Sequence, residues 1–230
     1  MDQSQDIVFY YFPRACSLAV HIGLEEGGFA YSRQLVDLRT RQNRDSGYLS
    51  LNPAGAIPAL AIDGQILTET QAILTFIGDN APAGRLLPDC GLAERYRAHQ
   101  WMNFLSSSVH AYIRSIFRPS AYAGHDAAAE EAVRKQGTLN LAKAVAVVEQ
   151  RLGDSPQAPW ALGEDFSVVD GYLFLMYLWT ADDRIPAVPD RPQWRRLATQ
   201  VWQRPAVRKV VAVEQQDRDF EIPLDGPPKG

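Results

Sequence analysis

The sequence predicts an α/β domain followed by an all-helical domain. Strand-like and helix-like patterns alternate up to residue 80, whereas every pattern after Leu92 is helical. A stretch rich in proline and glycine, residues 80–84, lies between the two parts and discourages either element from continuing. We therefore expect a first domain over residues 1–84, a helical domain over 85–216, and an extended, partly disordered tail over 217–230.

The first domain is expected to open with a β-α-β unit. Apolar runs at residues 7–11 and 31–36 predict strands, and residues 17–26 predict a helix that Gly27 and Gly28 end. A strand, a helix and a second strand in this order favour a parallel pair. Residues 58–62 and 65–67 predict a hairpin because Asp63-Gly64 suits a tight turn, and a helix is expected at about 70–79. The polar segment 39–50 predicts a loop or an irregular helix.

The second domain is expected to contain at least five helices. Apolar residues recur at intervals of three and four between Trp101 and Ile116, which predicts a long amphipathic helix that Pro119 ends. A second helix is expected from about Ala127 to Gly153. Ser167 and Asp170 have the spacing of a capping box, which predicts the start of an apolar, central helix over 171–180. Two more helices are expected at about 193–203 and 206–215.

Charge and composition exclude several classes of function. The chain has 23 basic and 27 acidic residues, a net charge of -4 and no basic stripe, which makes nucleic acid an unexpected partner. The longest apolar segment, residues 171–181, is shorter than the roughly 20 residues that cross a bilayer, so no membrane span is expected. Without a visible secretory signal, the expected compartment is the cytoplasm. Two cysteines far apart in sequence predict neither a disulfide framework nor a metal site.

Cys16 is the first candidate for chemistry. It follows the first strand and Pro13, and it directly precedes the helix that begins at Ser17. The unpaired N–H groups and the positive end of the dipole at a helix N-terminus favour a thiolate, which is the nucleophilic form of cysteine. A lone cysteine is more often a small buried residue. The proline-bent loop, the neighbouring hydroxyl of Ser17 and the helix start together shift the balance toward a reactive thiol. Cys90 is interpreted as incidental.

Two further segments could bind a ligand. Ile57 and Pro58 stand at the start of a strand, where a cis peptide bond would direct the Ile57 backbone outward to pair with an extended peptide. Thr68, Glu69 and Thr70 stand at a helix N-terminus, which can hold a carboxylate, while Glu69 can hold an ammonium group. Threonine and glutamate are also common helix caps. The residues alone therefore leave a structural role open.

These segments, in this order, resemble the cytosolic glutathione transferases, and the bacterial beta class most closely. The resemblance extends from about Ile7 to Gln215, and it rests on the order and spacing of several short motifs. These are residues 10–18 (YYFPRACSL), Asn52-Pro53, Gly55, residues 57–60 (IPAL), residues 67–70 (LTET), Ala72-Ile73, residues 101–104 (WMNF), residues 167–170 (SVVD) and residues 204–207 (RPAV).

The resemblance implies a thioredoxin-like first domain, a homodimer and a site for glutathione, with a cis bond at Pro58 and no metal. Cys16 matches the family's active-site cysteine, and Ser17 matches a neighbouring hydroxyl donor. Arg41 matches the group for the glycyl carboxylate, Ile57 pairs with the cysteinyl unit, and Glu69 and Thr70 hold the γ-glutamyl end. Asn103 and His110 match helix residues on the side of the second substrate, which is expected to be a small apolar electrophile. The same side is also expected to include Phe12, Ile113, Arg114 and Phe117.

Three activities remain open at this point. The first is conjugation of glutathione to an electrophile. The second is thiol–disulfide exchange through a mixed disulfide on Cys16. The third is non-catalytic binding or scaffolding on the same fold. A lysine commonly follows the histidine in this class, and Ala111 takes its place here. This departure affects the expected preference for electrophiles.

Overall fold

The computed structural model describes residues 6–91, 93–186 and 188–222. The chain forms two compact units, which confirms an α/β part and a helical part. The first contains the described residues up to Cys90 together with Gln203–Glu221, and the second contains the described residues between Gly91 and Trp202 together with Ile222.

The first unit contains a four-stranded mixed sheet. Its strands are β1 (Ile7–Tyr11), β2 (Ser32–Leu35), β3 (Ala59–Ile62) and β4 (Gln65–Thr68), in the order β2-β1-β3-β4. β1 and β2 are parallel, and both β3 with β1 and β4 with β3 are antiparallel. The expected β-α-β unit and hairpin are therefore confirmed.

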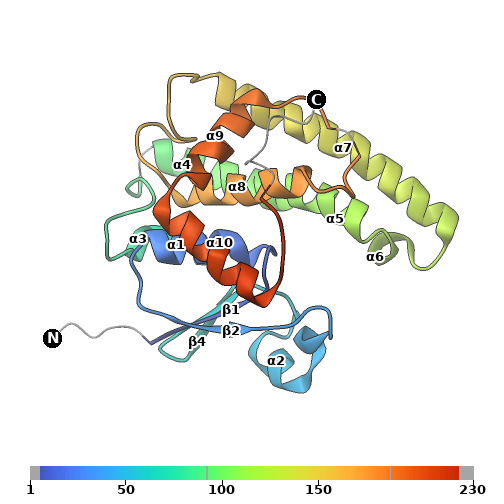
Figure 1. Cartoon of the computed structure of the whole chain (residues 1–230), viewed down its shortest axis with the longest axis horizontal. Coiled ribbons are helices and arrows are strands. Elements are labelled where there is room, and N and C mark those ends of the chain that lie inside the picture. The colour runs from blue at the N-terminus through green and yellow to red at the C-terminus, as the bar shows by residue number, and fades with distance from the viewer. Residues whose placement is uncertain (1–5, 92, 187, 223–230) are drawn as a thin grey trace. The chain divides into compact units, whose positions relative to one another are not determined.

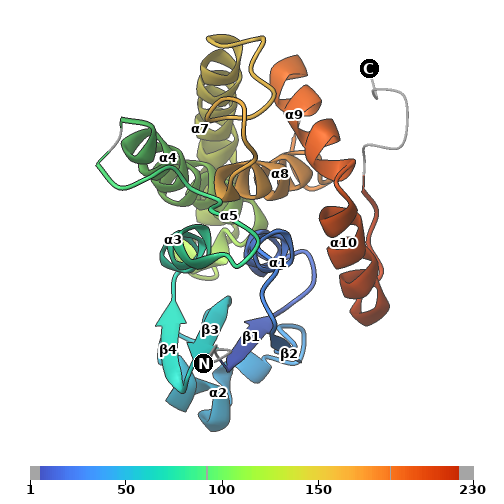
Figure 2. The ribbon, with the colours of Figure 1, turned by 90° about the vertical axis from the view of Figure 1, so that its left-hand side faces the viewer.

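Helices cover both faces of this sheet. α1 (Ser17–Glu26) and α3 (Thr70–Asn80) lie side by side on one face, as Figure 2 shows. The Phe9 and Tyr11 rings point from β1 toward His21 of α1, whereas Tyr10 contacts Tyr48 of α2 (Ser46–Leu51). Because successive side chains of a strand point to opposite faces, α2 lies on the other face. The expected irregular segment is thus the short helix η1 (Gln42–Arg44) followed by α2.

The last helix packs against α1. α10 (Pro205–Asp217) begins at the expected place, but the expected domain limits put it in the helical domain. In the structure, Arg204 pairs with Glu26 and Lys209 pairs with Glu25, and both glutamates lie at the end of α1. These ion pairs explain why α10 packs against the first unit. In the described part of the expected tail, the backbone is extended at Arg218, and Phe220 is buried with its carbonyl accepting a hydrogen bond from Gln215. Residues 223–230 lie outside the described residues.

Among the described residues of the second unit, the regular elements are helices, apart from one isolated bridge between Trp160 and Gly163. The expected long amphipathic helix is α4 (Ala93–Phe104) and α5 (Ala111–Phe117), joined by the π-helical turn η2 (Leu105–His110). Then follow α6 (Ser120–Ala123), α7 (Ala127–Gly153), α8 (Val168–Thr180) and α9 (Pro192–Trp202). Nearly all of α8 is buried, and the capping box of Ser167 and Asp170 is formed, as expected. Figure 1 labels these helices.

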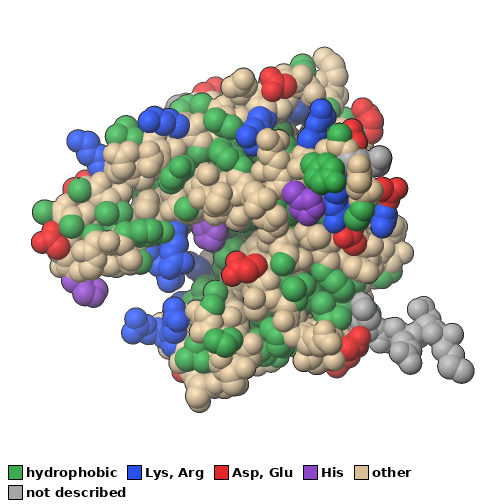
Figure 3. Space-filling model, turned by 180° about the vertical axis from the view of Figure 1, so that it is seen from behind, with side chains coloured by type: hydrophobic (Ala, Val, Ile, Leu, Met, Phe, Trp, Pro, Cys, Tyr) green, Lys and Arg blue, Asp and Glu red, His purple; other side chains and the backbone are tan. Residues whose placement is uncertain are grey.

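Two properties of the described residues concern membrane spans and nucleic-acid binding. No helix among the described residues is long and apolar enough to cross a membrane. On the face drawn in Figure 3, described basic side chains are interspersed with acidic and apolar ones.

Gly78 offers a test of the packing around α3. A Cβ atom at this position would lie 2.5 Å from Leu87 Cγ, and Leu87 is buried. We expect Gly78→Ala to lower the free energy of unfolding by about 1 to 3 kcal/mol, because the added methyl group overpacks the core. The control is Gly47→Ala, since nothing lies within 4 Å of a Cβ atom there. Urea denaturation of both variants measures the difference, and equal stability would contradict this account of the packing.

Candidate functional site

Four predicted segments meet at one edge of the sheet. In the strand register, Tyr11 at the end of β1 pairs with Leu35 at the end of β2, and Tyr10 pairs with Ala59 at the start of β3. Ala59 in turn pairs with Thr68 at the end of β4. The loops that carry Arg41, Cys16, Ile57 and Glu69 all adjoin this edge. They follow the strand order, with Arg41 after β2, Cys16 after β1, Ile57 before β3 and Glu69 after β4.

Cys16 occupies the N-cap position of α1, as the sequence predicts. Its side chain is partly exposed, and its Sγ atom donates to the carbonyl oxygen of Ile57 at 3.4 Å. This contact joins the β1–α1 loop to the segment before β3. The peptide bond between Ile57 and Pro58 is cis, which confirms that expectation.

Glu69 and Thr70 begin α3. Glu69 has a φ of 70°, a left-handed value that is costly for a residue with a side chain and that is concentrated at functional sites. Its carboxylate is exposed, and within the part of the chain that the structure describes it makes no ion pair. Thr70 is mostly buried and marks the first helical residue. The helix start therefore offers backbone N–H groups and an available carboxylate side by side.

Arg41 lies between β2 and η1, also with a left-handed φ of 64°. Its side chain is exposed, and among the described residues it forms no ion pair. By contrast, the neighbouring Arg39 is held by Asp37, and Arg44 donates to the carbonyl of Ala54. Of these three arginines, Arg41 is the one that is exposed with neither an ion pair nor a side-chain hydrogen bond among the described residues.

Ser17 closes the β1–α1 loop in this structure. Its hydroxyl is buried, donates to the Phe12 carbonyl at 2.9 Å and accepts from the Phe12 N–H at 3.2 Å. The hydroxyl proton is therefore bonded within the β1–α1 loop, and the role of Ser17 as a hydroxyl donor to a ligand stays a prediction. Ser17 positions Cys16 in this structure.

A buried pair that the sequence did not indicate also holds this loop. Glu214 of α10 accepts from the backbone N–H of Arg14 at 2.9 Å and pairs with His21 Nδ1 at 2.8 Å. Both side chains are almost completely buried. Arg14 has a φ of 58°, so the carboxylate holds a left-handed residue two positions before Cys16. Separated by nearly 200 residues in the chain, these groups gave no sequence signal.

Asn103 and His110 belong to the helical unit. Asn103 is an exposed residue of α4, and its carbonyl accepts from the hydroxyls of Ser106 and Ser107 in the π-helical turn. His110 ends that turn and contacts Trp179 of α8, with 5.0 Å between ring centroids. Burial, and to a lesser extent the charge of Arg114, lower the His110 pKa to about 4. The imidazole is therefore neutral near pH 7 and can act as a hydrogen-bonding group.

Two of the residues expected near His110, Ile113 and Phe117, differ in their surroundings. Ile113 is completely buried and belongs to the core of the helical unit. Phe117 lies 6.4 Å from Trp179, ring centroid to centroid, and the guanidinium of Arg184 lies 3.9 Å from the Phe117 ring centroid. Trp179 thus joins His110 and Phe117 in an aromatic cluster. The sequence did not indicate this cluster because α8 is apolar on most sides.

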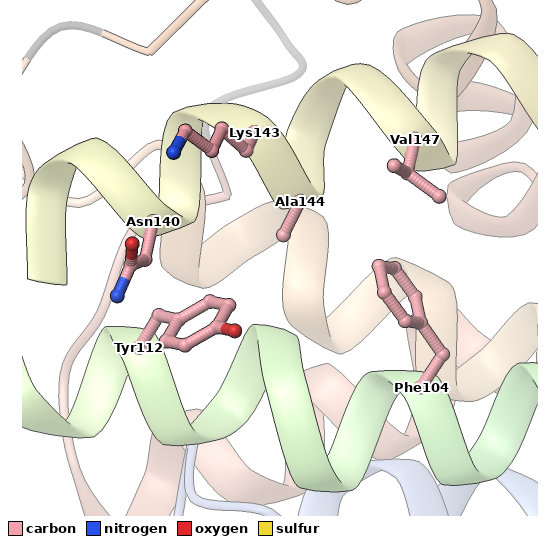
Figure 4. Close-up of a pocket in the computed structure, with 6 residues that line it drawn as sticks. All are labelled: Phe104, Tyr112, Asn140, Lys143, Ala144 and Val147. Atoms are coloured by element: carbon pink, nitrogen blue, oxygen red, sulfur yellow. The ribbon is translucent and has the colours of Figure 1, made fainter.

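A small pocket occurs elsewhere in the helical unit. It has a volume of about 160 Å³. Figure 4 shows Phe104 of α4 and Tyr112 of α5 facing α7 across it, and the other lining residues come from α7: Asn140, Lys143, Ala144 and Val147. None of the six is a cysteine, histidine or carboxylate. In the described part of the chain, no three potential metal ligands lie together either.

Comparisons with known proteins identify the family of the chain. Residues 14–80 match the model of the glutathione S-transferase N-terminal domain. Glutathione S-transferase GstA of Escherichia coli O157:H7 is 34% identical over 172 residues, which span 74% of this chain and 80% of that protein. The chain belongs to the glutathione S-transferase family.

Solved glutathione transferases share the whole fold. A glutathione transferase homologue from Sulfitobacter with bound glutathione is 30% identical, with a TM-score of 0.80, and the match covers 92% of this chain and 98% of that one. A bacterial beta class enzyme from Sphingomonas chungbukensis is 33% identical, with a TM-score of 0.75 and coverage of 90% and 98%. The thioredoxin-like first unit and the helical second unit are therefore those of a glutathione transferase.

Proposed function

We propose that this glutathione transferase binds reduced glutathione along the sheet edge and directs its thiolate at a small electrophile. The observation that carries the proposal is the order of groups at this edge. Along the edge lie, in order, a cation (Arg41), a thiol (Cys16), a backbone segment (Ile57) and a carboxylate beside a helix N-terminus (Glu69). Glutathione carries a glycyl carboxylate, a thiol, a cysteinyl backbone and a γ-glutamyl amino acid in the same order.

Each contact follows from the chemistry of the two sides. Arg41 would hold the glycyl carboxylate, because a guanidinium binds carboxylates through paired hydrogen bonds. The Ile57 backbone would pair with the cysteinyl unit in the manner of an added strand. Glu69 would bind the γ-glutamyl ammonium, and the start of α3 at Thr70 would bind the α-carboxylate. Pro58 shapes the segment, and Cys16 would face the sulfur. Asn103 and His110 stay candidates on the second-substrate side.

Calorimetric titration with glutathione, in the presence of a fresh reductant, tests the binding step. We expect saturable binding that weakens about tenfold or more in Glu69→Gln, because one charge-assisted contact is worth about 1.5 to 3 kcal/mol. The control is Asp63→Asn, which removes an exposed acid in the turn between β3 and β4. Absence of heat and of any shift in melting temperature at millimolar glutathione would contradict the proposal.

Thiol–disulfide exchange is the second candidate activity, and the partly exposed Cys16 thiol favours it. In exchange, the Cys16 thiolate attacks a glutathione disulfide, a mixed disulfide forms and one glutathione thiolate leaves. Cys16→Ala is expected to abolish the mixed disulfide detected by intact mass. If this variant retains conjugation, the cysteine serves exchange alone. If it loses conjugation as well, Cys16 also activates the glutathione thiol.

We propose further that the chain forms a homodimer and acts in the cytoplasm, with a site of beta-class type and no metal. The resemblance to the beta class supports these points. Sedimentation equilibrium tests the first of them, and a molecular mass near the 25.6 kDa of one chain would contradict it.

A further inference from the structure

Two guanidinium groups lie against the ring of Phe12. The Cζ atom of Arg39 is 5.7 Å from the ring centroid, and that of Arg218 is 5.5 Å from it. Phe12 is buried in the loop that leads from β1 to Cys16, and it packs with Ile57. The Ile57 carbonyl accepts a hydrogen bond from the Cys16 thiol. Both cations therefore border the loop that presents the thiol.

The two arginines differ in how their charge is compensated. Arg39 is held by Asp37, with Nε to Oδ1 at 2.9 Å and Nη2 to Oδ2 at 2.8 Å, and this pairing lowers the pKa of Asp37 to about 2. Arg218 is exposed and, in the described chain, forms no ion pair. The adjacent Asp217 accepts from Tyr11 and Arg33 instead. Arg218 is thus an uncompensated cation with its N–H groups available.

The helical unit shows the same pattern on its own. Arg184 lies over Phe117 but is bound by Asp182, with Nε to Oδ1 at 2.8 Å. Arg114, one turn after His110, is exposed and takes part in no ion pair among the residues described. His110 is uncharged near neutral pH and does not add to this charge. Each unit, taken by itself, therefore has an exposed arginine that forms no ion pair among the described residues. Arg218 lies against Phe12 in the first unit, and Arg114 lies one turn after His110 in the second.

We infer that the electrophile carries a carboxylate and that Arg218 binds it. This inference rests on the proposed transferase function and names its substrate class. A guanidinium offers parallel N–H donors that match a carboxylate, and contact with an aromatic ring limits the orientations that it must lose on binding. An apolar electrophile would leave this cation unused.

A matched pair of electrophiles tests the inference. The probes are 4-chloro-3,5-dinitrobenzoate and its neutral amide, 4-chloro-3,5-dinitrobenzamide. In each reaction the glutathione sulfur bonds to the ring carbon, the carbon–chlorine bond breaks, chloride leaves and the thiol proton passes to solvent. The kcat/KM of each probe is divided by its rate constant with free glutathione, which removes the difference in intrinsic reactivity.

We expect the corrected kcat/KM to favour the benzoate about tenfold, the size of one charge-assisted hydrogen bond. Arg218→Gln should remove this preference, because the benzoate loses its charged partner whereas the neutral amide has no charge to lose. The control Arg97→Gln makes the same change of net charge on α4 and should retain the preference. Equal rates for the two probes, or an unchanged preference in Arg218→Gln, would overturn the inference alone. No turnover of either probe would contradict the proposed transferase function and the inference with it.

Discussion

Replacing Asp170 with alanine is expected to lower the free energy of unfolding by about 2 to 6 kcal/mol. The carboxylate is completely buried, and its Oδ1 atom accepts from the N–H of Ala161 at 2.8 Å. Its Oδ2 atom accepts from the N–H of Ser167 at 2.8 Å and from the Ser167 hydroxyl at 2.9 Å. Alanine would leave two backbone donors unsatisfied inside the helical unit. Each of them costs about 1 to 3 kcal/mol.

Urea denaturation followed by circular dichroism measures this loss. The control is Asp165→Ala, which removes an exposed acid from the same loop and is expected to change stability by less than about 0.5 kcal/mol. If both variants lose the same amount, the hydrogen bonds of Asp170 do not hold the start of α8.

Asp170 should also make stability depend on pH. Burial raises its pKa from 3.8 to about 6, although the hydrogen bonds from Ala161 and Ser167 oppose the rise. The folded protein therefore binds this proton more tightly than the unfolded chain does, and the free energy of unfolding falls as the pH rises from about 4 to about 6. Two pKa units correspond to about 3 kcal/mol. We expect the stability advantage over Asp170→Asn to shrink by that order between pH 4 and pH 7, and a constant difference would contradict it.

The elements of the fold were predictable because their signals are local. The alternation of strands and helices, the Asp63-Gly64 turn and the capping box at Ser167 each lie within a few residues, and all are confirmed. The partner of α10 was not predictable from such signals. Its amphipathic pattern shows that one face is buried, but the ion pairs with Glu25 and Glu26 join residues nearly 180 positions apart.

The same distinction applies to the candidate site. Cys16, Ile57 and Glu69 could be named because each stands where a strand meets a loop or a helix, and the sheet register then brings their loops to one edge. The use of the Ser17 hydroxyl could not be predicted. Its acceptor is the carbonyl of Phe12, and the shape of the loop decides this contact.

Replacing Glu214 with alanine is expected to lower the free energy of unfolding by about 3 to 5 kcal/mol, the cost of breaking a buried pair. The change removes the partner of His21 Nδ1 and the acceptor of the Arg14 N–H. Because Arg14 lies in the loop of Cys16, glutathione binding should weaken as well. Denaturation measures the first effect, and calorimetry at a temperature where the variant is folded measures the second.

The conservative variant Glu214→Gln separates the hydrogen bonding of Glu214 to Arg14 and His21 from the packing of its side chain. An amide has nearly the same shape, its oxygen can accept from Arg14, and its N–H group can donate to a neutral His21 ring. It should therefore cost only about 1 to 2 kcal/mol and restore most of the glutathione affinity. The exposed neighbour in Gln216→Ala serves as the control on the same helix. If Glu214→Ala and Gln216→Ala bind glutathione equally well, the β1–α1 loop keeps its shape without α10. The strained backbone of Arg14 would then have to be held by its own loop.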